Sequence, residues 1–108
     1  MPFPVSSGLL DVCVLAVLSR GDAYGYKLTQ ELKRAVDLSE STLYPVLRRL
    51  QKENFLDDYE RPHDGRNRRY YHITASGLRE YVRLAEDWKR FKISIDKIIT
   101  GEAGHEQG

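Results

Sequence analysis

Hydrophobic positions dominate the first part of the chain and recur at helical spacing after it. Residues 8–19 are apolar at nearly every position, with Asp11 the one charge among them, which predicts a helix covered on most of its sides. Residues 24–36 place apolar side chains three and four positions apart, as in a helix with one buried stripe. Hydroxyl side chains within residues 39–42 can cap a third helix, which we expect to end at about residue 54.

The pattern changes to a two-residue period in the second half of the chain. Residues 55–61 and 68–74 are predicted to be strands, with Tyr71 and Ile73 on one face. Residues 62–67 between them are rich in turn formers. The three segments together predict a hairpin with a basic, exposed tip.

A long amphipathic helix is expected to follow the hairpin. Thr74 can cap its start, and Gly101 stops it soon after residue 99. Apolar side chains recur along it at intervals of three and four, namely Leu78, Tyr81, Ala85, Trp88, Phe91, Ile95 and Ile98. The polar residues after it are expected to form a loose tail.

Composition and charge exclude only a few classes of fold and function. The chain has 108 residues, 41% hydrophobic and 31% charged, which suits one compact folded domain. Its net charge of +1 gives no overall attraction to nucleic acid or acidic membranes, so any DNA signal depends on local clustering. The most apolar run is about half the length of a bilayer-spanning helix. A lone cysteine, Cys13, and the absence of a signal-peptide pattern at the start lead us to expect a cytoplasmic protein.

The third predicted helix has two different faces. At about 100° per residue it forms an apolar and a polar arc. The apolar arc holds Leu43, Val46, Leu47 and Leu50, and the opposite arc holds Ser41, Tyr44, Pro45, Arg48 and Lys52. Pro45 is expected near the helix start, where its missing N–H costs least. Hydroxyl and aromatic groups followed by Arg48, Arg49 and Lys52 suit a helix that enters the major groove, with a merely solvated face as the alternative.

The hairpin favours the first of these interpretations. It supplies a cluster of basic side chains that can neutralise phosphates, namely Arg61, His63, Arg66, Arg68 and Arg69. Two helices, a turn, a third helix and a hairpin form the order of a winged helix-turn-helix, whose third helix docks on DNA while the wing grips adjacent backbone. The predicted fold is therefore α+β, mostly α: a winged helix-turn-helix with a long C-terminal dimerisation helix.

Three strings resemble the signature of the PadR family. They are Tyr-Gly-Tyr at residues 24–26, the highly specific STLYPVLRRL at residues 41–50, and GRNRRYYHIT at residues 65–74. The resemblance runs over about residues 9–99 and implies a bacterial transcriptional regulator, in most members a repressor, that binds palindromic operators as a homodimer. The single C-terminal helix resembles the family's short branch. Asn67 departs from the pattern, where a basic residue is common, and this departure concerns only the number of wing phosphate contacts.

The resemblance and the polar arc together define the candidate DNA-binding residues. They lie at the recognition helix and in the wing: Ser41, Thr42, Tyr44, Pro45, Arg48, Arg49, Lys52, Arg66, Asn67, Arg68 and Arg69. The partner predicted for them is double-stranded DNA with a palindromic operator. A winged-helix module that binds protein without binding DNA is the alternative.

The last helix carries more apolar side chains than a compact domain can cover. Burying each large one contributes roughly 1.5–3 kcal/mol, so a two-fold partner is the simplest cover. The first helix would supply the opposing surface, as the resemblance also implies. The candidate dimer and effector residues are Leu9, Val12, Cys13, Tyr81, Leu84, Ala85, Trp88, Phe91, Ile95 and Ile98. This divides the chain into a DNA-binding domain at 1–74, a dimerisation helix at 75–100 and a flexible tail at 101–108.

Trp88 has two interpretations that the sequence leaves open. Paired across a two-fold axis, two indoles could wall a slot for a planar aromatic effector, and a central tryptophan on this helix of the short branch resembles such a drug-binding residue. It is otherwise interface packing.

Cys13 is expected to be an inert packing thiol, and the histidines lack metal-ligand spacing. With no nucleophile and base and no phosphate loop, we expect no cofactor, no metal and no enzymatic activity.

Overall fold

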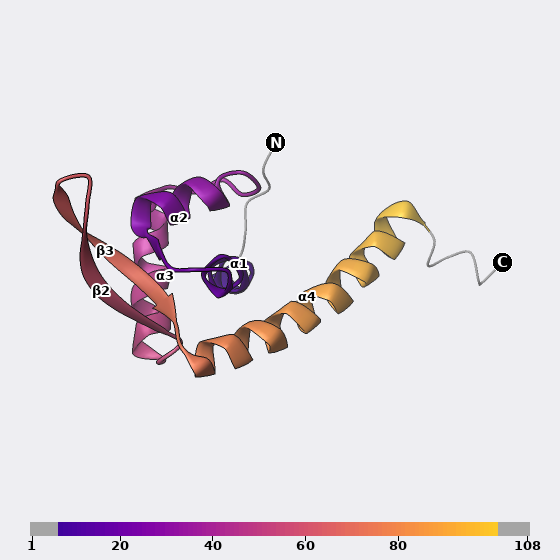
Figure 1. The fold of residues 1–108 in the computed structure, drawn as a ribbon. Coiled ribbons are helices and arrows are strands. Elements are labelled where there is room, and N and C mark those ends of the chain that lie inside the picture. Colours follow the sequence, from indigo (N-terminus) through magenta and orange to yellow (C-terminus); the bar gives the residue numbers. More distant parts are fainter. Residues whose placement is uncertain (1–6, 102–108) are drawn as a thin grey trace.

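The computed structural model describes residues 7–101, which form four helices and three strands. The elements are α1 (Ser7–Ser19), β1 (Ala23–Tyr24), α2 (Gly25–Leu32), α3 (Glu40–Lys52), β2 (Leu56–His63), β3 (Arg66–Ile73) and α4 (Ala75–Thr100). The first three helices pack together, the β2–β3 hairpin projects on one side of them, and α4 leaves on the other side as an arm (Figure 1). The molecule measures 64 × 30 × 21 Å, so the arm accounts for much of its length. This is the predicted winged helix-turn-helix with a long C-terminal helix.

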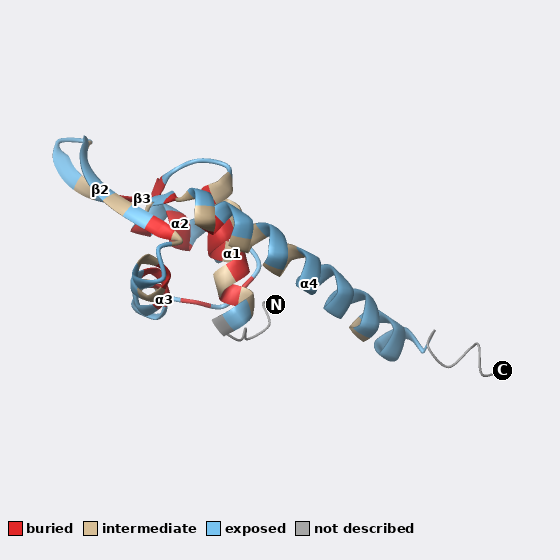
Figure 2. Ribbon diagram, turned by 90° about the horizontal axis from the view of Figure 1, so that it is seen from below, coloured by how far each residue is buried: buried red, intermediate tan, exposed pale blue. Residues whose placement is uncertain are grey.

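The core lies where α1 meets α2 and α3. Val14 and Leu15 of α1 are completely buried, as are Leu28 of α2 and Leu43 of α3. Figure 2 shows the buried residues gathered at these helix contacts, while most of α4 is exposed. The prediction that the first helix is covered on most sides is confirmed, because Leu10, Val12, Val14, Leu15 and Leu18 are all buried.

Helix α3 has the two predicted faces. Its apolar arc of Leu43, Val46, Leu47 and Leu50 is buried, and the Ser39 hydroxyl caps the helix by accepting a hydrogen bond from the Thr42 N–H at 3.3 Å. Pro45 was expected near the helix start, but it lies inside the helix at the sixth position. Residue 45 therefore provides no N–H for the Ser41 carbonyl group one turn earlier.

The predicted hairpin is part of a three-stranded antiparallel sheet with the order β1-β3-β2. The sequence pattern missed β1, a two-residue strand that pairs Ala23 with Tyr71. The six-residue loop predicted for residues 62–67 was wrong, because the strands continue to a two-residue turn of Asp64 and Gly65. Both turn residues have positive φ, 53° and 83°, the conformation that matches the twist of a tight hairpin.

Helix boundaries agree with the prediction at α4 and differ at α2 and α3. Thr74 caps α4 by accepting the Gly77 N–H at 2.9 Å, and Gly101 ends it in the left-handed region. Helices α2 and α3 are shorter than predicted and end at Leu32 and Lys52. None of the helices within residues 7–101 is long and apolar enough to span a bilayer. The predicted tail, beyond Gly101, lies outside the described residues.

Candidate nucleic-acid interface

A groove of about 680 Å³ lies between α3 and the hairpin. Four elements contribute to it: strand β1, the start of α2, the polar arc of α3 and the arginine-rich strand β3. Its lining consists of Tyr24, Gly25, Tyr26, Glu40, Tyr44, Arg48, Gln51, Arg66, Asn67, Arg68, Arg69 and Tyr71. Four of these side chains are arginines and one is a carboxylate, so the groove carries a positive charge even though the chain as a whole is almost neutral.

The groove brings together about half of the predicted DNA-binding residues. Tyr44 and Arg48 of α3 face the four consecutive wing residues Arg66, Asn67, Arg68 and Arg69. Four further predicted residues, Ser41, Thr42, Pro45 and Lys52, are exposed on α3 but do not line the groove. The hydroxyl groups of Ser41 and Thr42 lie 2.9 and 3.2 Å from the Ser39 hydroxyl, so they extend the cap of the helix.

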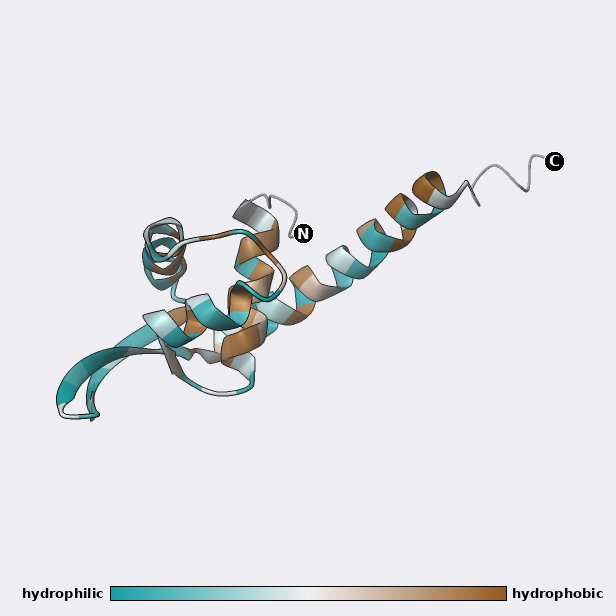
Figure 3. Ribbon diagram, turned by 90° about the horizontal axis from the view of Figure 1, so that it is seen from above, coloured by the Kyte–Doolittle hydropathy of each residue, from teal (hydrophilic) through white to brown (hydrophobic). Residues whose placement is uncertain are grey.

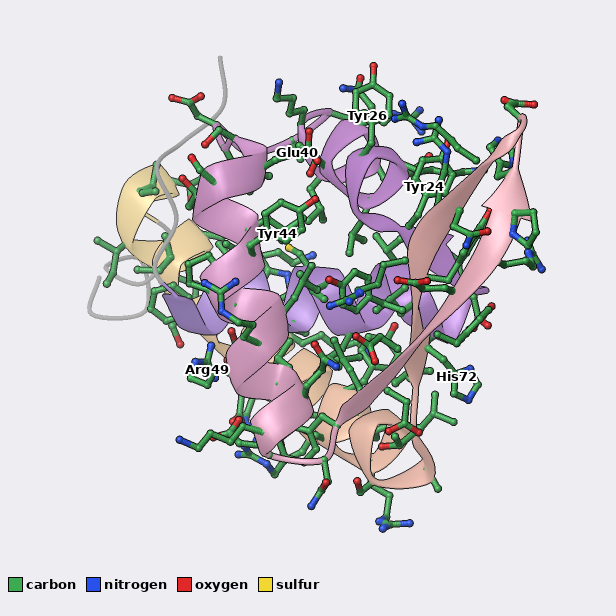
Figure 4. The ribbon with its side chains drawn as sticks, turned by 90° about the vertical axis from the view of Figure 1, so that its left-hand side faces the viewer. Tyr24, Tyr26, Glu40, Tyr44, Arg49 and His72 are labelled. Atoms are coloured by element: carbon green, nitrogen blue, oxygen red, sulfur yellow. The ribbon has the colours of Figure 1, made fainter. Side chains whose placement is uncertain are left out.

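Arg49 lies apart from the predicted residues that line the groove. Its Nη2 donates to Asp11 Oδ1 of α1 at 2.5 Å, and its Nη1 lies 3.4 Å from Glu53 Oε1. The hydrogen bond to Asp11 is the main reason why the pKa of Arg49 is raised. In Figure 4 Arg49 lies on the edge of α3 away from Tyr44 and the hairpin. One residue along a helix rotates a side chain by about 100°, which is enough to separate Arg49 from Arg48.

Tyr44 occupies the end of the groove where α2 and α3 approach each other. Its hydroxyl group donates a hydrogen bond to Glu40 Oε2 at 3.1 Å. A Cβ atom on Gly25 would lie 2.9 Å from the Tyr44 oxygen, so only glycine leaves room for the ring here. Burial, followed by the hydrogen bond to Glu40, raises the pKa of Tyr44, and the hydroxyl stays protonated as a donor. Tyr24, Tyr26, Glu40 and Tyr44 line one end of the space between α3 and the hairpin (Figure 4).

The cations of the wing are held partly by aromatic rings. The Arg68 guanidinium lies over the Tyr24 ring, 4.7 Å from its centroid, and its Nε atom is buried without a hydrogen-bond partner among the described residues. Arg69 instead lies 3.5 Å from Asp58 and 3.9 Å from Glu60. Cation–π contacts orient a guanidinium without neutralising it, so Arg68 keeps its charge available to an anion.

Several groove residues were missed at the sequence level. Tyr24, Tyr26, Glu40, Gln51 and Tyr71 all line the groove but were not among the candidates. Tyr24 and Tyr26 belong to the Tyr-Gly-Tyr string of the family signature, and the glycine between them is a position where another element can approach closely. For Glu40 the local signal is its position one turn before Tyr44, because side chains four residues apart are neighbours on a helix.

A second groove, of about 300 Å³, lies between α1 and α4. It is mainly apolar and is lined by Gly8, Leu9, Val12, Leu84, Asp87, Trp88 and Phe91. Five of the predicted dimer and effector residues are therefore neighbours within one chain. Tyr81 and Cys13 pack against the core, and Ala85 is half-buried. Burial raises the pKa of the Cys13 thiol, which disfavours the reactive thiolate.

The outer part of α4 continues this apolar surface beyond the domain. Phe91, Ile98 and Ile99 are 59%, 71% and 75% exposed, although they are large and apolar. Ile95 is half-buried on the same arm. Figure 3 shows the hydrophobic bands that run along α4 to its end. Among residues 7–101 no group of histidine, cysteine and acidic side chains could hold a metal ion, and His105 lies outside this range.

Comparison with known proteins assigns the chain to a family. Residues 14–83 match the model of the transcriptional regulator PadR-like family. The chain is 42% identical to smu.1704 from Streptococcus mutans, whose crystal structure superposes with a TM-score of 0.88 over 94% of this chain and 95% of that one. A PadR-like transcriptional regulator from Bacillus cereus gives 30% identity and a TM-score of 0.78, covering 85% and 92% of the two chains. The transcriptional regulator Rv3488 of Mycobacterium tuberculosis is 35% identical over 76% of this chain and 75% of its own length. The chain belongs to the PadR-like family of transcriptional regulators.

Proposed function

We propose that this regulator is a homodimeric repressor that binds a palindromic DNA operator and is released by a small aromatic or hydrophobic effector. The observation that carries the proposal is the groove between α3 and the hairpin, where Arg48, Arg66 and Arg68 converge with tyrosines on an otherwise neutral protein. Such a combination suits a duplex, because arginines contact phosphates or guanine edges while the exposed arc of α3 fits the major groove.

Dimerisation is proposed through α4 and α1. Exposed apolar side chains such as Phe91 and Ile98 need a cover, and a second copy supplies an identical stripe. A two-fold axis places the two copies of α3 about one turn of DNA apart, roughly 34 Å. In this scheme residues 1–74 bind DNA, residues 75–100 mediate dimerisation, and the operator is a palindrome.

The effector is proposed to bind in the apolar groove between α1 and α4. Trp88 and Phe91 line it with ring centroids 6.1 Å apart, and flat rings favour a planar aromatic ligand. A ligand can release DNA only if it binds more tightly to a dimer whose recognition helices are wrongly spaced. The single tryptophan of the chain makes binding measurable by its own fluorescence.

Titration with duplexes from the region upstream of the protein's own gene tests the proposal. We expect binding whose affinity falls steeply with salt, because each neutralised phosphate releases counterions. Arg48→Ala, and separately neutralisation of Arg66, Arg68 and Arg69, should weaken binding. Addition of planar aromatic compounds should quench Trp88 and release the duplex.

Two outcomes would contradict parts of this proposal. If the three wing arginines can be replaced with no change in DNA affinity, the winged domain is better explained as a protein-interaction module. If no aromatic compound in the panel both quenches Trp88 and releases DNA, the effector part fails and Trp88 is interface packing.

A further inference from the structure

One carboxylate lies among the arginines of the α3–hairpin groove. Glu40 is the first residue of α3 and lines the groove together with Arg48 and Arg66. A carboxylate repels the phosphates that arginines attract. It therefore lowers the affinity of a surface that contacts only the DNA backbone. An acidic residue in the first helical turn also favours the helix dipole, but that effect does not require Glu40 to face the groove.

The Tyr44 side chain holds Glu40 in place. Its Oε2 accepts the hydrogen bond from the Tyr44 hydroxyl at 3.1 Å. The Tyr44 ring in turn packs against Gly25, where an added Cβ would come within 2.9 Å of the hydroxyl oxygen. A carboxylate has about four lone-pair sites, and this contact uses one of them. Glu40 can therefore accept a second hydrogen bond from a group that enters the groove.

DNA offers few donors to such an acceptor. In the major groove the base edges carry two kinds of donor, the N4 amino group of cytosine and the N6 amino group of adenine. Adenine also presents the N7 acceptor beside its amino group, which repels a carboxylate, so cytosine is the better match. The first residues of a recognition helix are those that reach base edges, and Glu40 holds the first position of α3.

We propose that Glu40 determines operator specificity by accepting a hydrogen bond from the N4 amino group of a cytosine. Tyr44 is then a positioning residue for the Glu40 carboxylate, and each half-site of the operator contains one C·G pair that depends on Glu40. This inference rests on the proposed DNA-binding function and adds one base preference to it.

Selection of duplexes from a randomised pool, with the full-length protein and with Glu40→Gln, tests the inference. Glutamine both donates and accepts, so it matches the N6 and N7 groups of adenine. We expect the variant to shift its preference from cytosine to adenine at one position of each half-site, by about tenfold in competition binding. Glu40→Asp keeps the charge but withdraws the acceptor, and should lose the cytosine preference without gaining one for adenine.

Glu53→Gln is the matched control, because it removes the same charge beyond the other end of α3 and Glu53 does not line the groove. It should keep the wild-type preference. If Glu40→Gln binds every sequence more tightly with an unchanged preference, Glu40 acts only through its charge and the inference is overturned. Retention of the cytosine preference by both Glu40 variants would overturn it as well. If the wild-type protein selects no duplex at all, the proposed function itself fails, which is a separate result.

Discussion

The Asp11 carboxylate of α1 binds the Arg49 guanidinium of α3 at 2.5 Å, on the side of α3 that faces away from the hairpin. Only 16% of the Asp11 side chain is exposed, so this carboxylate depends on its partner. The adjacent Arg48 lines the groove. Two consecutive arginines thus have different surroundings, and the difference is measurable.

We expect Arg49→Ala to reduce stability more than Arg48→Ala, and Arg48→Ala to reduce DNA affinity more than Arg49→Ala. Loss of Arg49 leaves the mostly buried Asp11 carboxylate unpaired, which costs about 1–2 kcal/mol of unfolding free energy. Loss of Arg48 removes an exposed cation from the groove and leaves packing unchanged. Urea unfolding gives the unfolding free energy of each variant, and DNA titration gives its affinity for the duplex. Equal losses of stability in the two variants would contradict the separation of roles.

Gly25→Ala should weaken DNA binding while the fold is retained. The added Cβ comes within 2.9 Å of the Tyr44 oxygen and 3.3 Å of its Cε1 atom, so the ring must move away from α2. Because the displaced atoms are the far end of a side chain that is 37% exposed, the movement does not disturb the core. Circular dichroism checks that the fold is retained, and DNA titration measures the loss of affinity. A folded Gly25→Ala variant with the DNA affinity of the wild type would contradict the role of the Tyr44 position.

Asp22 should stabilise the fold above about pH 4 and stop doing so in acid. Its Oδ2 accepts a hydrogen bond from the Tyr59 hydroxyl at 2.6 Å, and its Oδ1 lies 2.9 Å from His72 Nδ1. Partial burial raises the pKa of Asp22, but these contacts and the charge of Arg61 outweigh burial, and the net pKa is lowered below 3.8. A lowered pKa in the folded state means that the stabilisation is complete above the unfolded value and is lost as the pH falls through the folded value.

The measurement is the difference in unfolding free energy between the wild type and Asp22→Asn from pH 7 to below about pH 4. The difference should be present at pH 7 and should shrink below about pH 4. Asp37→Asn, at an exposed position before α3, should show no comparable change. A difference that does not shrink below about pH 4 would contradict the assignment.

Phe91→Glu should weaken dimerisation without unfolding the chain. Phe91 is 59% exposed in the single chain, so a charge there is tolerated by the monomer and is unfavourable only in an apolar interface. Analytical ultracentrifugation should detect a shift toward monomer and, with it, a loss of affinity for a palindromic duplex. Lys89→Glu changes an exposed polar position by two charge units and serves as the control. A wild type that is already monomeric at high concentration would contradict the proposed dimer.

The sequence by itself determined the features that depend on local spacing. A nearly continuous apolar run located α1, capping residues located α3, and the three-and-four periodicity located α4. The apolar arc of α3 was assigned correctly because a helix turns by a fixed angle per residue. Thr74 and Gly101 marked the ends of α4 because capping chemistry acts within a few residues.

Only the tertiary structure decided the features that depend on distant neighbours. Strand β1 has two residues and no periodicity of its own, and it forms because β3 offers it a pairing edge. The helical wheel of α3 separates Arg48 and Arg49 by about 100°, but the presence of Asp11 beside Arg49 and of the hairpin beside Arg48 follows from packing. The contact between Gly25 and Tyr44 likewise joins two helices whose distance no local pattern specifies, because a sequence period indicates the direction of a side chain and not the group that meets it.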